Sequence, residues 1–223
     1  GSGTDRVHTV VGGDTEATRA AKTIAKERGL RLTLFAGSNL TIGKASVRGY
    51  ISGDRVFIRT DHPYYTADQI MRHEAGHDMI AKGEVNPDAV RERLNDTFTT
   101  EEVDRIAEAY IAAYEGSNLT PAEIWEEVIC DSLGDMNFFA GISSAPEGVE
   151  DLLSAAKREA QSQANAARGP PAEALDEAKT STEPPASEAL EHNNGRRPAI
   201  YCLAVRSWTF PASTTARPEG TAR

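Results

Sequence analysis

Polar and apolar positions divide the N-terminal part of the chain into short strand-like stretches. Residues 31–35 alternate polar and apolar side chains, as a β-strand with one buried face does. Residues 46–51 and 55–60 are two further strand-like runs, and the Ser52-Gly53-Asp54 sequence between them is typical of a hairpin turn. The polar, glycine-containing residues 36–44 predict a loop. We therefore expect a small antiparallel or mixed sheet.

Six other segments repeat their apolar residues every three or four positions, which is typical of helices. Capping signals set the ends of several of them. Asp14 and Gly29 bound the first segment, Thr66 and Gly83 bound the second, and Gly141 follows the fifth. The predicted fold class is therefore α+β, with the small sheet packed on a helical bundle. The predicted helices cover residues 15–28, 67–81, 88–94, 100–114, 121–139 and 147–167.

The composition changes beyond Gly169, where Pro, Ala, Glu, Ser and Thr begin to dominate. Residues 4–167 are predicted to form one folded domain. Residues 168–223 are predicted to be a low-complexity, disordered tail, because they cannot bury enough apolar surface to offset their ordering entropy. Within this tail, Ala199–Phe210 has strand character, and residues 7–11 predict another short strand.

Charge and cysteine content exclude several classes of function. The chain of 223 residues has a net charge of -10 and a pI near 5.0, which argues against a nucleic-acid partner because phosphate binding needs a basic surface. No apolar run is long enough for a membrane span, and no secretion signal is visible. We expect a cytoplasmic protein, with delivery outside the cell left open. Cys130 and Cys202 do not form a disulfide framework, and Cys130 reads as a small buried hydrophobe.

The predicted chemistry centres on an H-E-x-x-H sequence, His73 to His77, inside the second predicted helix. Residues four apart lie on one face of a helix, so His73 and His77 can direct both imidazoles at one point, as a zinc ion requires. Glu74 lies about 100° further round the helix, beside a metal-activated water instead of among the ligands. The pattern thus predicts two metal ligands and one general base.

The composition of this helix gives a second argument that the histidines have a partner. Ile70, Met71, Ala75, Met79 and Ile80 make the helix apolar on several sides, which is typical of a buried helix. A buried histidine is costly unless it is paired or liganded. The partner can be a metal ion, a carboxylate or a backbone carbonyl.

A third ligand is predicted on the fifth helix. Glu127 and Asp131 lie about 40° apart on one flank of this helix, whereas Glu126 lies on the other flank. Glu127 can complete a site of two histidines and one glutamate, and Asp131 can hold the second ring nitrogen of a ligating histidine. Glu126 stays the alternative ligand. Glu127, Asp131 and Asp135 can instead form a solvated acidic stripe.

The H-E-x-x-H sequence followed by E-x-x-x-D resembles the gluzincin metallopeptidases. The resemblance implies a zincin-like fold in which His73, His77 and Glu127 are the zinc ligands. It also implies that Glu74 is the catalytic base and that Asp131 supports His73.

The resemblance extends upstream of the zinc helix. The hairpin over residues 48–58 is similar to that of ImmA/IrrE-type peptidases and of related domains in phages and bacterial mobile elements. The interval between residues 77 and 127 is far longer than in the gluzincin thermolysin. We therefore expect an inserted helical pair in that interval.

The resulting expectation is a zinc-dependent peptidase with one Zn²⁺ per chain and a peptide or protein substrate. Glu74 is expected to take a proton from the attacking water and to pass it to the leaving amine. The alternative is a non-catalytic metal-binding interaction module of a phage or mobile-element protein, and a third hypothesis is a metal-free helical adaptor. Zinc content and a protease assay separate the three.

Two features of substrate binding are hypotheses at this stage. The strand over residues 55–60 can hold an extended peptide if it lies at the sheet edge. Tyr50, His62, Tyr64 and Tyr65 are candidates for a donor to the oxyanion by proximity in sequence, and none of them is assigned that role.

Overall fold

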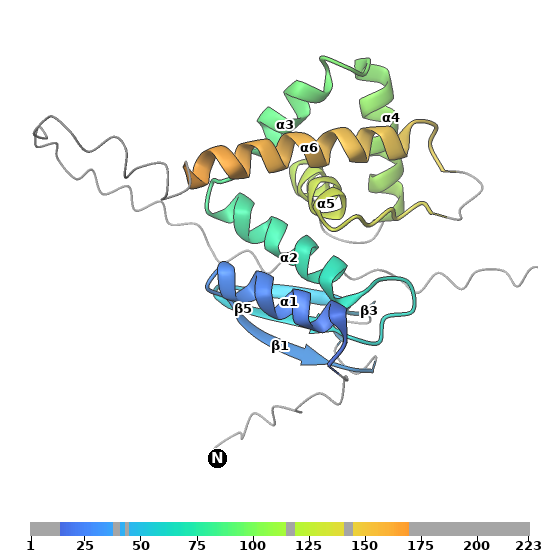
Figure 1. Cartoon of the computed structure of the whole chain (residues 1–223). Helices are drawn as coiled ribbons and strands as arrows, with labels where there is room; N and C mark the ends of the chain where they lie inside the picture. Colours follow the sequence, from blue (N-terminus) through green and yellow to red (C-terminus); the bar gives the residue numbers. More distant parts are fainter. Residues whose placement is uncertain (1–13, 38–40, 43–44, 115–118, 141–144, 170–223) are drawn as a thin grey trace, which may run out of the picture.

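The computed structural model describes residues 14–37, 41–42, 45–114, 119–140 and 145–169. Its elements in chain order are α1 (Glu16–Glu27), β1 (Arg31–Phe35), β2 (Thr41–Ile42), β3 (Ala45–Ser46), β4 (Gly49–Ser52), β5 (Arg55–Arg59), α2 (Ala67–Ala81), α3 (Pro87–Leu94), α4 (Thr100–Ala113), α5 (Pro121–Leu133) and α6 (Val149–Arg168). The predicted α+β class is confirmed. The sheet and α1 lie at one end of the molecule, α2 crosses the middle, and α3 to α6 form the other end (Figure 1).

The sheet has the strand order β1-β5-β4. β1 runs parallel to β5, and β4 runs antiparallel to it through the predicted hairpin, in which Gly53 has φ +59°. β5 is therefore the central strand, and the hypothesis that it lies at the edge is wrong. The hairpin signal places β4 beside β5, but it does not determine where β1 pairs. Val56 and Ile58 on the buried face of β5 belong to the core shared with α1 and α2.

The loop predicted over residues 36–44 is only partly correct. Residues 41–42 and 45–46 pair as the antiparallel ladder β2–β3, so the strand predicted over residues 46–51 is divided between β3 and β4. Two residues per strand are too few to produce an alternating pattern.

The first helix is capped by Thr15 and not by Asp14. The Thr15 and Thr18 side chains form a reciprocal capping box, which satisfies backbone donors at the helix start. Asp14 instead pairs with Arg19 at the surface.

α5 ends at Leu133, whereas the predicted helix continues to residue 139. The end is a Schellman motif, in which the Met136 backbone N–H donates to the Asp131 carbonyl at 2.8 Å. Asp135 takes the left-handed conformation that this motif needs, with φ 53°.

The sequence conceals this helix end because the left-handed position usually carries glycine, and here Gly134 comes one residue before it. Asp135 leaves the helix and pairs with Arg72 at 2.7 Å and with Lys157. Glu127 and Asp131 are buried. The alternative of a solvated acidic stripe on α5 is therefore wrong.

The interval between α2 and α5 holds α3 and α4, as the expected inserted helical pair. α6 agrees with its predicted range to within two residues at either end. The strand predicted over residues 7–11, residues 170–223 of the predicted tail and the Ala199–Phe210 stretch lie outside the described residues. No helix in the described ranges is long and apolar enough to cross a membrane.

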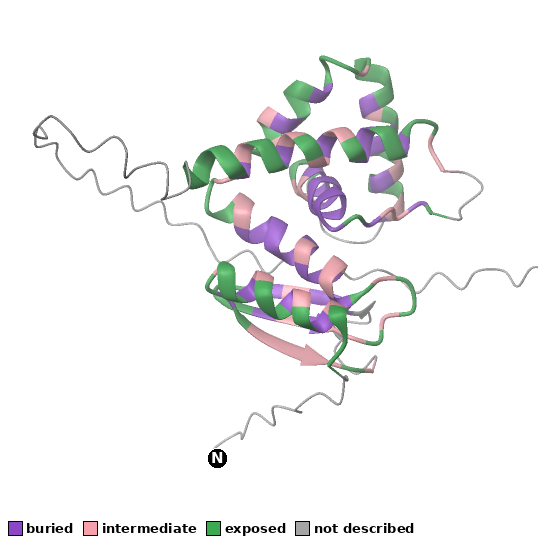
Figure 2. Cartoon of the chain, in the orientation of Figure 1, coloured by how far each residue is buried: buried purple, intermediate pink, exposed green. Residues whose placement is uncertain are grey.

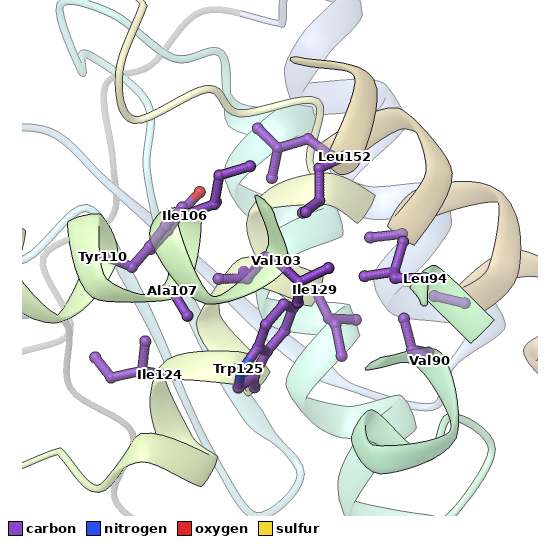
Figure 3. Packing of buried hydrophobic residues seen from close by; sticks show 14 of the residues in the cluster. Val90, Leu94, Val103, Ile106, Ala107, Tyr110, Ile124, Trp125, Ile129 and Leu152 are labelled. Carbon is purple, nitrogen blue, oxygen red and sulfur yellow. The ribbon is translucent and has the colours of Figure 1, made fainter. Parts of the chain in front are cut away.

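Two hydrophobic clusters form the core. One joins the sheet, α1 and α2, and the other is built mainly from α3 to α6. In the second cluster, Trp125 and Ile129 of α5 pack with apolar side chains of α3, α4 and α6 (Figure 3). Figure 2 shows that buried residues dominate α2 and α5. These two helices are thus the interior elements on which a buried site can form.

α2 and α5 cross where Gly76 faces Cys130. A Cβ atom on Gly76 would lie 2.9 Å from Cys130 Sγ and 3.3 Å from Cys130 Cα, so this approach requires glycine. Cys130 is fully buried, in agreement with its predicted role as a small hydrophobe. The close crossing brings the H-E-x-x-H face of α2 toward the acidic residues of α5.

We predict that Gly76→Ala destabilises the protein. Alanine favours a helix by about 1 kcal/mol, but overpacking the crossing costs about 1–3 kcal/mol, and the contact with the Cys130 backbone places this site toward the upper end, so we expect a net loss of up to about 2 kcal/mol. Urea unfolding followed by circular dichroism measures it. Cys130→Ala in the Gly76→Ala background removes the clashing sulfur atom and should recover part of the loss. A higher unfolding midpoint for Gly76→Ala would show that the crossing is not tight.

Candidate metal centre

α2 and α5 bring His73, His77 and Glu127 together. One ligand atom from each residue lies within 4.8 Å of the other two, and all three side chains are buried. His73 Nε2 lies 3.3 Å from His77 Nε2 and 3.5 Å from Glu127 Oε2, and His77 Nε2 lies 3.4 Å from Glu127 Oε1. Atoms bound about 2.0–2.1 Å from a tetrahedral zinc ion lie about 3.3 Å apart. The two histidine nitrogens and the Glu127 carboxylate of this triad therefore lie close enough together to hold one metal ion.

Local sequence places each member of the triad. The two histidines lie one turn apart on α2, which begins after Thr66, the predicted cap, whose backbone N–H donates to the Gln69 side chain at 3.0 Å. Glu127 lies on α5, which starts with a Thr120 capping box and a proline. Glu127 enters the group, whereas Glu126 is half-buried and outside it.

Asp131, one turn after Glu127, contacts the other nitrogen of the His73 ring. Its Oδ1 atom lies 2.9 Å from His73 Nδ1 and accepts a hydrogen bond from Arg48 Nη2 at 3.0 Å. Its Oδ2 atom accepts one from the Tyr110 hydroxyl group at 3.3 Å. Burial alone would raise the pKa of this carboxyl, but the Arg48 charge and the His73 contact lower it below its ordinary value. An ionised Asp131 keeps the His73 proton on Nδ1 and leaves Nε2 as an acceptor facing the triad.

Glu74 is buried beside the triad but is not part of it. Its Oε1 atom occupies the space that a side chain on Gly49 would need, because a Cβ there would lie 2.9 Å from it. Burial raises the pKa of Glu74 to about 8, although the Arg48 charge acts in the opposite direction. Glu74 is thus a carboxyl group that holds a proton tightly in the metal-free protein.

Both histidines of the triad are neutral. Burial is the largest cause that lowers the pKa of His73, and the Arg48 charge acts in the same direction. Burial, His73 and Arg48 together lower the pKa of His77 well below its ordinary value. Neutral imidazole is the form that offers a lone pair to a metal ion.

Glu127 is a buried carboxyl group that its neighbours do not fully satisfy. Its Oε2 atom has no hydrogen-bond partner among the described residues. Burial, followed by the Asp131 charge, raises its pKa well above the ordinary value. A cation held by the triad would remove both costs. The residues present therefore fit a metal ion.

Two residues of the centre were not predicted to belong to it. Arg48 lies just before β4 and is only 4% exposed, and its single sequence signal is a charge inside a strand-like run. Tyr110 belongs to the apolar stripe of α4, for which the sequence predicts only packing, but its hydroxyl group is directed at Asp131.

The candidates for an oxyanion donor lie on β4 and on the connection between β5 and α2. Tyr50 stacks on a phenylalanine of β5, with ring centroids 4.5 Å apart. His62 stacks on Tyr65, whose hydroxyl group lies 3.5 Å from a backbone carbonyl after α5. The Tyr64 side chain is 68% exposed. These contacts describe packing, and we assign the donor role to none of them.

No protein-family model, curated protein or solved structure matches the chain. The functional argument therefore depends on the chemistry of the residues themselves.

The arrangement can hold a metal ion through two neutral nitrogens and one carboxylate. Three protein ligands leave a tetrahedral ion one further position, which a catalytic site uses for water or substrate. Glu74 and Asp131 are ionisable groups beside the triad that are not ligands, and Asp131 is already engaged by His73 and Arg48.

We predict that the metal-free protein loses stability as pH rises from about 7.5 to about 8.5. An unperturbed histidine has a pKa of about 6.5, so above about pH 7.5 the histidines are mostly neutral in the unfolded chain as well as in the folded one. Glu74, with a pKa of about 8 when folded and an ordinary value of 4.5 when unfolded, binds more protons in the folded state, so folding weakens as the proton is lost. Thermal unfolding of chelator-treated protein measures this slope, and Glu74→Gln should flatten it. A midpoint that rises across the window contradicts the prediction.

Proposed function

We propose that the protein is a zinc-dependent peptidase whose metal ligands are His73, His77 and Glu127. The observation that carries the proposal is the buried triad at ligand spacing with Glu74 beside it. Two histidines and one glutamate form a common ligand set of catalytic zinc sites. The resemblance of the two sequence motifs to gluzincin metallopeptidases supports the same conclusion, and a zincin-like fold belongs to the proposal.

Zinc is the ion that this donor set favours. Imidazole nitrogen suits zinc and other transition metals, whereas Mg²⁺ and Ca²⁺ prefer sites made of oxygen ligands. The two Nε2 atoms lie 3.3 Å apart, and each lies 3.4 to 3.5 Å from one oxygen of the Glu127 carboxylate, which is close to the ligand spacing of a tetrahedral zinc ion.

The proposed mechanism assigns one task to each residue. Zn²⁺, when bound, supplies the Lewis acidity that polarises a peptide carbonyl and makes water more acidic. Glu74 takes a proton from the attacking water and then donates it to the leaving amine. Burial raises the pKa of Glu74 to about 8 in the metal-free protein, and a bound cation would lower that pKa and so favour the ionised carboxylate that accepts the proton. Asp131 keeps His73 in the ligating tautomer.

One observation favours a second candidate function, a metal-binding interaction module without turnover. The three ligands are at most 2% exposed, so a metal ion bound there would be largely shielded from solvent. Shielding of this kind is typical of structural metal sites, which need no open position. Glu74 argues for the peptidase, because a structural site has no use for a buried general base.

We predict that Glu74→Gln retains about one zinc per chain but loses hydrolysis by a factor of about 10²–10⁴. Elemental analysis measures the metal, and a quenched-fluorescent peptide library measures hydrolysis. Full activity in Glu74→Gln would refute the proposed mechanism. Zinc in the wild type without hydrolysis of any library member would favour the interaction module.

We predict that Glu127→Ala loses most of its zinc, since one of three ligands is removed. Glu126→Ala is the matched control, because the neighbouring glutamate lies outside the triad and should leave the zinc content unchanged. Elemental analysis of both variants, purified without a polyhistidine tag, makes the comparison. Equal zinc in the two variants would mean that Glu127 is not a ligand.

A further inference from the structure

Arg48 reaches the metal centre from the sheet side of the molecule. Its backbone carbonyl accepts a hydrogen bond from Arg59 N–H at 2.9 Å, so the main chain is fixed next to β5. The next residue, Gly49, allows β4 to pass close to α2, because a Cβ there would lie 2.7 Å from Ile70 and 2.9 Å from Glu74. This close approach lets the Arg48 side chain reach Asp131 on α5.

One carboxylate oxygen connects Arg48 to the triad. Asp131 Oδ1 accepts the hydrogen bond from Arg48 Nη2 at 3.0 Å and lies 2.9 Å from His73 Nδ1. The Tyr110 hydroxyl group holds the other oxygen. The Asp131 carboxylate therefore accepts hydrogen bonds from Arg48 and Tyr110, and the oxygen that Arg48 holds is the one that lies 2.9 Å from His73 Nδ1.

Stability alone does not explain a buried arginine at this position. Arg48 is 4% exposed and Asp131 is fully buried, and a buried ion pair often contributes little or nothing to stability relative to apolar side chains of the same volume. The Nε atom of Arg48 has no hydrogen-bond partner among the described residues, which adds a further cost. Such a costly group at the centre suggests a role in organising the centre itself.

We propose that Arg48 is a positioning residue of the metal centre, which fixes the Asp131 carboxylate so that His73 presents Nε2 to the metal ion. This inference deepens the proposed function and depends on the triad being a zinc site. It predicts that Arg48 raises zinc affinity, although its charge lies near the cation.

The sign of the effect separates positioning from simple electrostatics. The Arg48 guanidinium repels a divalent cation, so an arginine that acted only through its charge would weaken zinc binding, and its removal would strengthen binding. An arginine that positions His73 does the opposite. Loss of a residue that supports a ligating histidine typically weakens metal affinity by about 10–100-fold.

The experiment measures zinc dissociation constants by chelator competition for Arg48→Met, Asp131→Asn and the double variant. We expect Arg48→Met to weaken binding about 10-fold or more and the double variant to bind no more weakly than Asp131→Asn alone, because both changes break the same chain of contacts. Arg48→Lys keeps the charge but loses the planar fork, so it should also bind more weakly than the wild type. This conservative variant keeps the test valid if Arg48→Met fails to fold.

Arg28→Met is the matched control. Arg28 has the same 4% side-chain exposure and pairs with the buried Asp78 at 2.7 Å, but it makes no contact with Asp131 among the contacts described above. The Arg28→Met substitution should lower the midpoint of unfolding without changing the affinity for zinc. The visible spectrum of the Co²⁺-loaded protein provides a second readout, since its bands report ligand geometry and should change in Arg48→Met but not in Arg28→Met.

The outcomes are distinct. Tighter zinc binding in Arg48→Met, or effects of Arg48→Met and Asp131→Asn that simply add, would overturn the positioning role while the peptidase proposal stands. A wild type that binds neither zinc nor Co²⁺ would overturn the proposed function first, and the positioning role would fail with it.

Discussion

The buried carboxylate of Asp131 is the interaction on which the arrangement of the centre depends. It is held by His73 from α2, Arg48 from the entry to β4 and Tyr110 from α4, while its own backbone belongs to α5. An ionised group without contact to water is tolerable only when it is paired and hydrogen-bonded. All of these elements must therefore be in position before the charge of Asp131 is fully paired. The Asp131 side chain thus constrains how the sheet packs against the helical bundle.

A second constraint, the helix crossing at Gly76, sets how close the charged groups come. Contact between Gly76 and Cys130 removes the space that a side chain would otherwise impose between α2 and α5. His73 lies three residues before Gly76 and His77 lies one residue after it, and their Nε2 atoms both approach a Glu127 carboxylate oxygen to within 3.5 Å. A wider crossing would separate the two halves of the triad. The distance between α2 and α5 therefore determines whether the three ligands can reach the same metal ion.

Prediction from the sequence succeeded where the helical repeat alone determines which side chains share one face of a helix. The spacing of His73 and His77 and that of Glu127 and Asp131 each place two side chains on one helix flank, and the structure brings both pairs to one point. It failed where the answer depends on distant parts of the chain. Nothing local to Arg48 indicates a partner on α5, and the central position of β5 follows from how β1 pairs. The end of α5 was missed because Asp135 adopts a conformation that usually belongs to glycine.

The charges of the centre give the final argument for a cation. Glu74, Glu127 and Asp131 are all buried, and Arg48 is the buried cationic side chain described beside them. With the three carboxyl groups ionised, the negative charge exceeds the positive charge by the amount that one divalent ion supplies. Without such an ion, Glu74 and Glu127 escape the cost of burial by holding protons, which is the physical meaning of their raised pKa values. A packing role alone gives no reason to collect these groups in one place, whereas a metal ion gives a reason for each of them.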